Sequence, residues 1–119
     1  MILLGLSLAS ASAAASDPWR KQDSAWQATY FLVHAADWGQ TRDIARQCQQ
    51  GPYYETNPVL GECPHITKVD YYFLGTALLH YGIARALPRT YRRLFQAGTI
   101  GMQMGYVGNN ASIGLNIRF

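Results

Sequence analysis

The residues best suited to chemistry are two histidines and two carboxylates. His34 and Asp37 are three residues apart, a spacing that makes side chains neighbours on a helix. Glu55 follows in a segment rich in proline and glycine, and His80 lies further along the chain. Imidazole and carboxylate groups bind zinc and related divalent metals and serve as general acids and bases. If the four side chains converge, the sequence predicts a metal-assisted hydrolase.

A purely structural role for the same residues is the alternative. Asp37 would then be hydrogen-bonded to His34 or to an arginine inside a helical bundle, and Glu55 would cap a turn of its loop. His80 would be a hydrogen-bonded core histidine. The chain has no H-E-x-x-H, G-x-S-x-G or phosphate-loop motif. We therefore expect a non-enzymatic protein without a metal or other cofactor, and keep the hydrolase as the second hypothesis.

Three helices are expected to position these residues. Their predicted ranges are Ala25 to Arg46, Lys68 to Leu87 and Arg89 to Gly108. Asp23 or Ser24 can cap the first, and Ser24 has the capping-box spacing to Gln27. Pro88 separates the other two. Asn109-Asn110 is a stop signal, and the tail after it alternates apolar and polar residues. The predicted fold class is all-α: a small bundle of about three helices with a short irregular or extended C-terminal tail.

The first fifteen residues have the character of an export signal. Residues 1–15 are small and apolar, and two A-x-A patterns end at Ala13 and Ala15, as signal peptidase requires. No lysine or arginine precedes the apolar run, which departs from the usual basic start of such segments. Because 119 residues fit one domain, we expect a signal segment at 1–15 and a single helical domain at 16–119.

The two cysteines of the chain are expected to form a disulfide. Cys48 and Cys63 bracket the connector between the first two predicted helices, and export would place them where cysteine pairs are oxidised. Closing a loop of roughly fifteen residues stabilises a fold by about 3 kcal/mol in the chain-entropy model. Two free buried thiols are the alternative. The connector is expected to be an ordered loop closed by this bond.

Glycines recur at helical spacing in the second and third predicted helices. They are Gly75 and Gly82 in the second, and Gly98, Gly101, Gly105 and Gly108 in the third. Each glycine inside a helix costs roughly 0.5 to 1 kcal/mol relative to alanine. Small-residue stripes let two helices approach closely, as membrane helices do. We expect the two stripes to pack against each other.

Composition leaves the relation to the membrane open between two arrangements. Only 14% of residues are charged, against about a quarter in ordinary soluble domains. In the first arrangement the last two helices form an inner-membrane hairpin with the cysteines in the periplasm and the arginines of 85–93 in the cytoplasm. In the second, the chain is a soluble periplasmic domain. The short basic stretch lacks the motifs of a nucleic-acid-binding protein, so no nucleic-acid partner is expected.

Three segments of the sequence are similar to segments of other proteins. They are D-W-G-Q-T-R at 37–42, Y-Y-E-T-N-P-V-L-G at 53–61 and A-L-P-R-T-Y-R at 86–92. The chain resembles a group of small uncharacterised signal-bearing or membrane helical proteins of proteobacteria and their phages. The resemblance implies a helical fold and export, and it implies no activity. The expected function is that of a small exported envelope or membrane-associated protein, acting through self-association or a membrane-protein partner.

Overall fold

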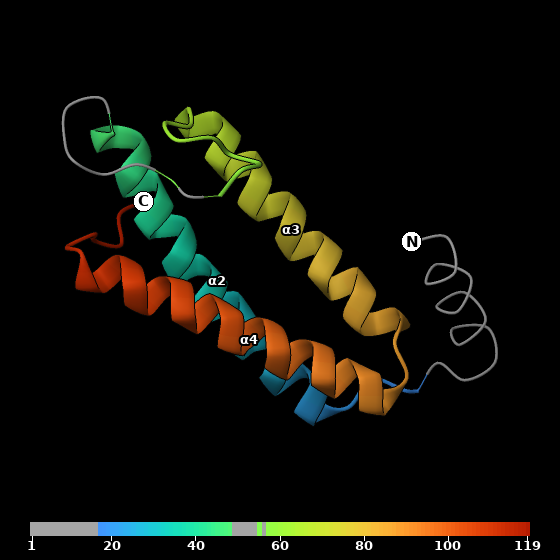
Figure 1. Cartoon of the computed structure of the whole chain (residues 1–119). Coiled ribbons are helices and arrows are strands. Elements are labelled where there is room, and N and C mark those ends of the chain that lie inside the picture. Colours follow the sequence, from blue (N-terminus) through green and yellow to red (C-terminus); the bar gives the residue numbers. More distant parts are fainter. Residues whose placement is uncertain (1–16, 49–54, 56) are drawn as a thin grey trace.

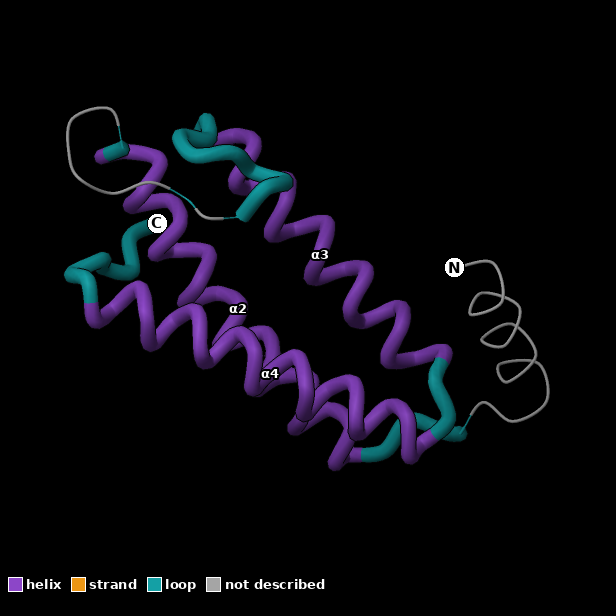
Figure 2. The backbone as a smooth tube through the Cα atoms, viewed as in Figure 1, coloured by secondary structure: helices purple, strands orange, loops and turns teal. Residues whose placement is uncertain are grey.

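The computed structural model describes residues 17–48, 55 and 57–119, and this part of the chain contains three helices and no strand (Figures 1 and 2). They are α2 (Lys21–Gln47), α3 (Ile66–Ala86) and α4 (Arg89–Ser112). α2 packs on both other helices, whereas α3 and α4 diverge from the turn that joins them. The predicted all-α bundle is confirmed. The expected signal segment, 1–15, lies outside the described residues.

Two helix starts differ from the prediction because the capping contacts lie at earlier positions in the chain. α2 begins four residues before Ala25, since the Asp23 carboxylate accepts the backbone N–H of Arg20 at 2.9 Å. Ser24 instead accepts the indole N–H of Trp19. α3 begins at Ile66, where the ring of His65 accepts the N–H of Thr67. A carboxylate or imidazole at a helix start satisfies donors that have no partner within the helix.

The predicted end of α4 was wrong. The helix continues through Asn109 and Asn110 to Ser112. Asn110 does not stop it because its side-chain amide is held from α2: it donates to the Gln40 side-chain oxygen at 3.1 Å. The tail after the helix then turns back onto α2, where the N–H of Arg118 bonds the Gly39 carbonyl at 3.1 Å. Tertiary contacts therefore override the local stop signal.

The interface between α2 and α4 is a polar seam. Its members from α2 are Asp23, Gln27, His34 and Asp37, and those from α4 are Arg92, Gln96, Gln103 and Asn110. On both helices the spacing follows a heptad pattern of three and four residues, which normally carries apolar side chains. The two helices run in the same direction, and each polar residue meets a partner at the same level. The seam thus replaces an apolar core with paired hydrogen-bonding groups.

A buried ion pair lies at the N-terminal end of the seam. The Arg92 guanidinium donates to Asp23 at 2.8 Å, and both side chains are almost fully buried. Arg93 donates to the other oxygen of the same carboxylate at 3.0 Å. Although burial of Asp23 opposes ionisation, the Arg20 N–H and the two arginines together hold the pKa of this carboxyl below its ordinary value. Asp23 therefore fixes the start of α2 against the start of α4.

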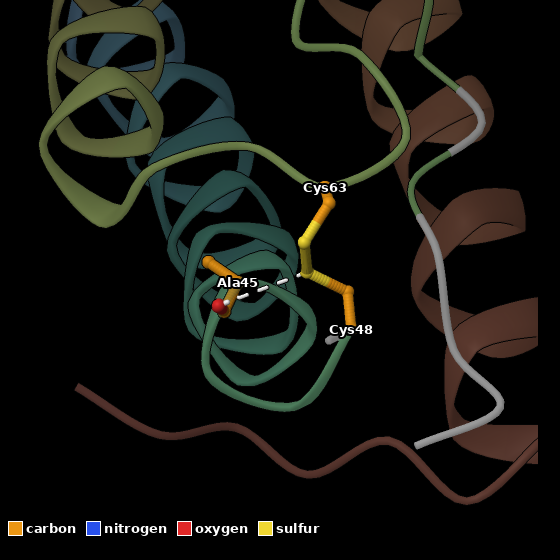
Figure 3. Close-up of a disulfide and its surroundings, with 3 residues drawn as sticks. All are labelled: Ala45, Cys48 and Cys63. Carbon is orange, nitrogen blue, oxygen red and sulfur yellow. Dashed lines mark hydrogen bonds between the residues drawn. A yellow bond between two sulfur atoms is a disulfide. The ribbon is translucent and has the colours of Figure 1, made fainter. Parts of the chain in front are cut away.

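The opposite end of the bundle has a small apolar core and the disulfide. Leu60, Val69 and Phe73 form the core, with Trp38 packed against it. Cys48, directly after α2, is bonded to Cys63, as predicted, with a Cα–Cα distance of 5.6 Å (Figure 3). The bond ties the segment before α3 to the end of α2. Residues 49–54 and 56 of the connector lie outside the described residues.

The predicted packing of the glycine stripes was wrong. A Cβ atom built at any of the six glycines would meet nothing within 4 Å in the described chain. α3 and α4 diverge (Figure 1), and all four glycines of α4 are exposed. Gly39, which the sequence did not single out, is the tightly packed glycine. A Cβ atom there would lie 2.5 Å from the Ile117 side chain.

The membrane-spanning hairpin, one of the two arrangements that the composition left open, is not found. Among the described residues, no helix is both long and apolar enough to cross a bilayer. The physical reason lies in the polar side chains within both helices. Lys68, Asp70 and Arg85 interrupt α3, while the seam residues and three arginines at its start interrupt α4.

Candidate functional site

A cavity of about 420 Å³ lies where α2, α3, α4 and the segment before α3 meet. α2 contributes His34, Asp37 and Thr41, which follow one another at helical spacing on its inner face. Glu55 and Asn57 come from the segment before α3. The aromatic walls are Tyr30, Tyr72, Phe73 and Tyr106, and the remaining amides are Gln103, Asn109 and Asn110. The size is typical of pockets that bind small molecules.

His34 is held on both sides of its ring. Its Nε2 lies 2.9 Å from the Phe73 carbonyl oxygen, and its Nδ1 lies 2.8 Å from the side-chain oxygen of Gln103. Both neighbours are acceptors in this arrangement. Both contacts are therefore hydrogen bonds only if both ring nitrogens carry hydrogen, or if the Gln103 amide is turned over so that its NH₂ faces the ring.

Gln103 links His34 to Asp37. Its NH₂ donates to the Asp37 carboxylate at 3.2 Å. If the amide turns over, its oxygen faces Asp37, and that contact is a hydrogen bond only when Asp37 is protonated. The three groups thus satisfy all these contacts with one proton more than a neutral His34 ring and an ionised Asp37 carry. That proton is on His34 in one orientation of the amide and on Asp37 in the other. The orientation of the Gln103 amide is therefore coupled to which of these two α2 side chains holds the proton.

Asp37 is held in an environment that disfavours its charge. The side chain is 9% exposed. Burial first, and the nearby charge of Glu55 second, raise the pKa of Asp37 to about 6, against hydrogen bonds from Thr41 and Gln103 that lower it. Burial, together with Tyr72 and Asp37, also raises the pKa of Tyr30 to about 12. The cavity therefore has a negative electrostatic character.

The segment before α3 places Glu55 and Asn57 in the wall. The Glu55 carboxylate accepts the backbone N–H of Asn57 at 3.1 Å, and the Asn57 side chain donates to the Tyr72 hydroxyl at 2.9 Å. The other side of the Asn57 amide accepts the N–H of Val59. This is the turn-capping role predicted for Glu55, and Asn57 caps the same loop. The contact with Asn57 also helps to hold the Glu55 carboxylate in the cavity lining.

His80 does not belong to this site. Its Nδ1 lies 2.9 Å from the Gln27 amide nitrogen, and its Nε2 lies 2.7 Å from the Thr99 hydroxyl. Since the Thr99 hydroxyl donates its hydrogen to a backbone carbonyl, Nε2 is the donor to Thr99 and Nδ1 accepts from Gln27. Burial, with a contribution from His34, lowers the pKa of His80 to about 4. The ring stacks on Tyr30 with centroids 3.4 Å apart. His80 is thus a neutral core histidine, as the structural interpretation predicts.

Of the four residues predicted to carry chemistry, three lie in the cavity and one does not. His34, Asp37 and Glu55 line the cavity, and His80 lies outside its lining. Within the described chain, no group of three or more histidine, cysteine, aspartate or glutamate side chains could hold a metal ion. The convergence required by the metal-assisted hydrolase hypothesis is not found.

Sequence reasoning missed the α4 side of the site. Gln103 and Asn110 connect Asp37 to the rest of the seam, and Tyr106 lines the cavity. A signal for the amides exists in the sequence. The residues at 92, 96, 99 and 103 follow the same three-and-four spacing as the polar residues of α2, and the residue at 110 lies one full heptad after 103. Two matching polar heptad patterns predict two helices that face each other through them.

Comparisons with protein-family models, with curated proteins and with solved structures find no match. The resemblance carried by the three strings at 37–42, 53–61 and 86–92 stays a prediction. The function must be argued from the chain's own chemistry.

Proposed function

We propose that this protein is an exported, non-enzymatic component of a bacterial or phage-derived envelope that binds an anionic membrane surface. The observation that supports this proposal is the inverted placement of its side chains. Polar residues fill the interface between α2 and α4, while large apolar side chains lie on the outside. Large exposed apolar patches on soluble proteins mark interaction sites.

The outer face of α3 is the best-defined apolar stripe. Tyr71, Leu74, Leu78 and Tyr81 follow one another at spacings of three, four and three residues, and the exposed fraction of Leu78 is 66%. These residues share one side of the helix. Transferring a leucine side chain from water into an apolar environment is favourable by roughly 1.5 to 3 kcal/mol. A stripe of this kind provides substantial affinity for the acyl region of a bilayer.

Basic residues at one end of the stripe favour an anionic surface over a neutral one. Arg85, at the end of α3, is exposed, and so are Arg20 and Lys21 at the start of α2. The two helix ends lie together, since Arg92 bonds both the Arg85 carbonyl and Asp23. Each basic residue near an anionic leaflet contributes about 1 kcal/mol. Trp19 and Tyr81, which contact Arg85, are side chains that favour the interface between lipid and water.

Export is the second part of the proposal. The disulfide between Cys48 and Cys63 is compatible with an oxidising compartment. The A-x-A patterns before Asp17 support cleavage of the first fifteen residues. Mass spectrometry of the protein recovered from the periplasmic fraction tests this part. We expect a chain shortened near Ala15 with no alkylatable thiol, and an uncleaved chain with two free thiols would contradict it.

Vesicle sedimentation tests membrane binding. We expect the protein to sediment with phosphatidylglycerol vesicles and to bind phosphatidylcholine vesicles at least tenfold more weakly, with the difference reduced by salt. Leu78→Ser should weaken binding by about tenfold, because one leucine no longer enters the bilayer. Leu32→Ser is the matched control, since Leu32 is 74% exposed on α2, outside the α3 stripe. Equal loss in both variants, or no binding by wild-type protein, would contradict the proposal.

A further inference from the structure

The cavity has a wall chemistry that is distinct from the outer apolar surface. Two carboxylates, Asp37 and Glu55, line it, and no lysine or arginine appears among its described lining residues. Among these lining residues, only the His34 ring can carry a positive charge. At most one imidazolium therefore faces two carboxylates, and the cavity attracts cations.

Burial of the Asp37 carboxylate reduces the stability of the fold, which indicates a functional role for this residue. The side chain is nine-tenths buried, yet its partners are neutral groups: the amides of Gln103 and Asn110 and the Thr41 hydroxyl. The other carboxylate of the cavity, Glu55, disfavours its charge further. Asparagine would occupy the same space without charge. Residues that reduce stability in a cleft are characteristic of functional sites.

The rest of the lining favours an organic cation over a bare metal ion. Calcium takes six to eight oxygen ligands and zinc four tightly grouped ones, and the described residues offer no group of three acidic, histidine or cysteine ligands. The cavity, at about 420 Å³, also has room for a molecule of several heavy atoms. Three tyrosines line it, Tyr30, Tyr72 and Tyr106, and aromatic rings near a carboxylate favour alkylammonium groups.

We infer that this cavity binds a small organic cation, with an ammonium group held between Asp37 and Glu55 and its carbon skeleton against the tyrosine rings. The inference rests on the cavity alone and does not depend on membrane binding.

Titration calorimetry of the full, oxidised chain tests this inference. The probes are choline and ethanolamine, with 3,3-dimethylbutan-1-ol as the uncharged analogue of choline. We expect heat of binding with at least one amine and at least tenfold weaker binding of the alcohol, because the alcohol lacks the charge that the carboxylates attract. Equal affinity for choline and the alcohol, or no binding of either amine, would overturn the inference.

Carboxylate variants locate the bound ammonium. Asp37→Asn and Glu55→Gln should each weaken amine binding about tenfold. Glu62→Gln is the matched control, because Glu62 is an exposed carboxylate seven residues from Glu55 and outside the cavity lining. Circular dichroism shows whether each variant is folded. Unchanged affinity in both folded cavity variants would overturn the inference.

The pH dependence gives an independent readout. The other titratable groups that line the cavity with Asp37 are Tyr30 and His34 of the same helix and Glu55, Tyr72 and Tyr106. Since the pKa of Asp37 lies near 6, the affinity for ethanolamine should rise between pH 5 and pH 7 as this carboxyl ionises. Asp37→Asn should reduce that rise. A wild-type affinity that falls over this range would contradict a cation held by Asp37.

An ammonium group can belong to a free amine or to a lipid head group, and a vesicle experiment separates the two sources. If the head group is the natural ligand, phosphatidylethanolamine added to phosphatidylglycerol vesicles should strengthen binding of wild-type protein but not of Asp37→Asn. If a free amine is the ligand, ethanolamine binds in solution and the added lipid has no such effect.

Discussion

Asp37 and His80 show how single buried groups set the pH response of this protein. The pKa of Asp37 is raised from 3.8 to about 6, so its contribution to stability is full below pH 3.8 and is lost as pH rises through 6. The pKa of His80 is lowered from 6.5 to about 4. Its contribution is present above pH 6.5 and is lost as pH falls toward 4. The two effects have opposite signs and similar size, and between pH 4 and 6 they largely cancel.

Without the Asp37 carboxyl, the pH dependence of stability should show the effect of His80 alone. We expect the free energy of unfolding of Asp37→Asn to rise between pH 4 and pH 6.5 by about 3 kcal/mol, while wild-type protein changes much less. At pH 7 the variant should be the more stable protein. Urea unfolding at a series of pH values measures this, and a wild-type pH profile in the variant would mean that Asp37 does not carry the raised pKa.

A variant at His80 tests the pH dependence that Asp37 contributes. His80→Gln keeps polar atoms near Gln27 and Thr99 but does not titrate. Its free energy of unfolding should fall between pH 4 and pH 6, because the titration of Asp37 is then unopposed. The same urea series serves as the measurement. The prediction fails if stability rises over that range.

At the scale of elements, the helices follow from local patterns while their partners do not. Pro88 and the apolar stretch before it predict the boundary between α3 and α4, and that boundary is confirmed. The side of α4 that meets α2 could not be predicted from hydrophobicity, because the seam is polar and the apolar side chains lie outside. The same inversion explains the error about the glycines, which were expected inside.

Glycine substitutions should therefore have opposite effects at two places. Gly101→Ala and Gly105→Ala should each stabilise the protein by about 0.5 to 1 kcal/mol, because alanine favours the helix and its Cβ meets nothing. Gly39→Ala should destabilise it by on the order of 1 to 3 kcal/mol, since the added carbon clashes with Ile117 and Phe119 of the tail. Thermal unfolding measures all three. Destabilisation by the α4 variants would show that their stripe is covered in solution.

At the scale of the whole molecule, the site depends on contacts between distant parts of the chain. The sequence predicted His34, Asp37 and Glu55 as chemical residues, and the fold brings them to one cavity. The structural interpretation of the sequence predicted a hydrogen-bonded core histidine at His80, but it could not predict that Gln27 and Thr99 would occupy the two ring nitrogens. Periodicity places residues on faces of helices, whereas hydrogen-bond partners are decided by which faces meet.

The disulfide joins the stability of the bundle to the shape of the cavity. Leu60 and Asn57 line the cavity and precede Cys63 by a few residues, while Cys48 follows directly after α2. Replacing both cysteines by serine removes the constraint on the loop between them. The free energy of unfolding should fall by about 3 kcal/mol, the value for a loop of this length in the chain-entropy model.

Amine binding should weaken in the same variant, because the wall that carries Glu55 is then held to α2 only by noncovalent contacts. Urea unfolding and calorimetry with choline measure the two effects separately. A reductant should reproduce both changes in wild-type protein and should leave the serine variant unaffected. If the serine variant unfolds at the wild-type urea concentration, the bond does not constrain this end of the bundle. If it is less stable yet binds choline with wild-type affinity, the cavity wall is positioned by the contacts of Asn57 with Tyr72 and Glu55 without help from the disulfide.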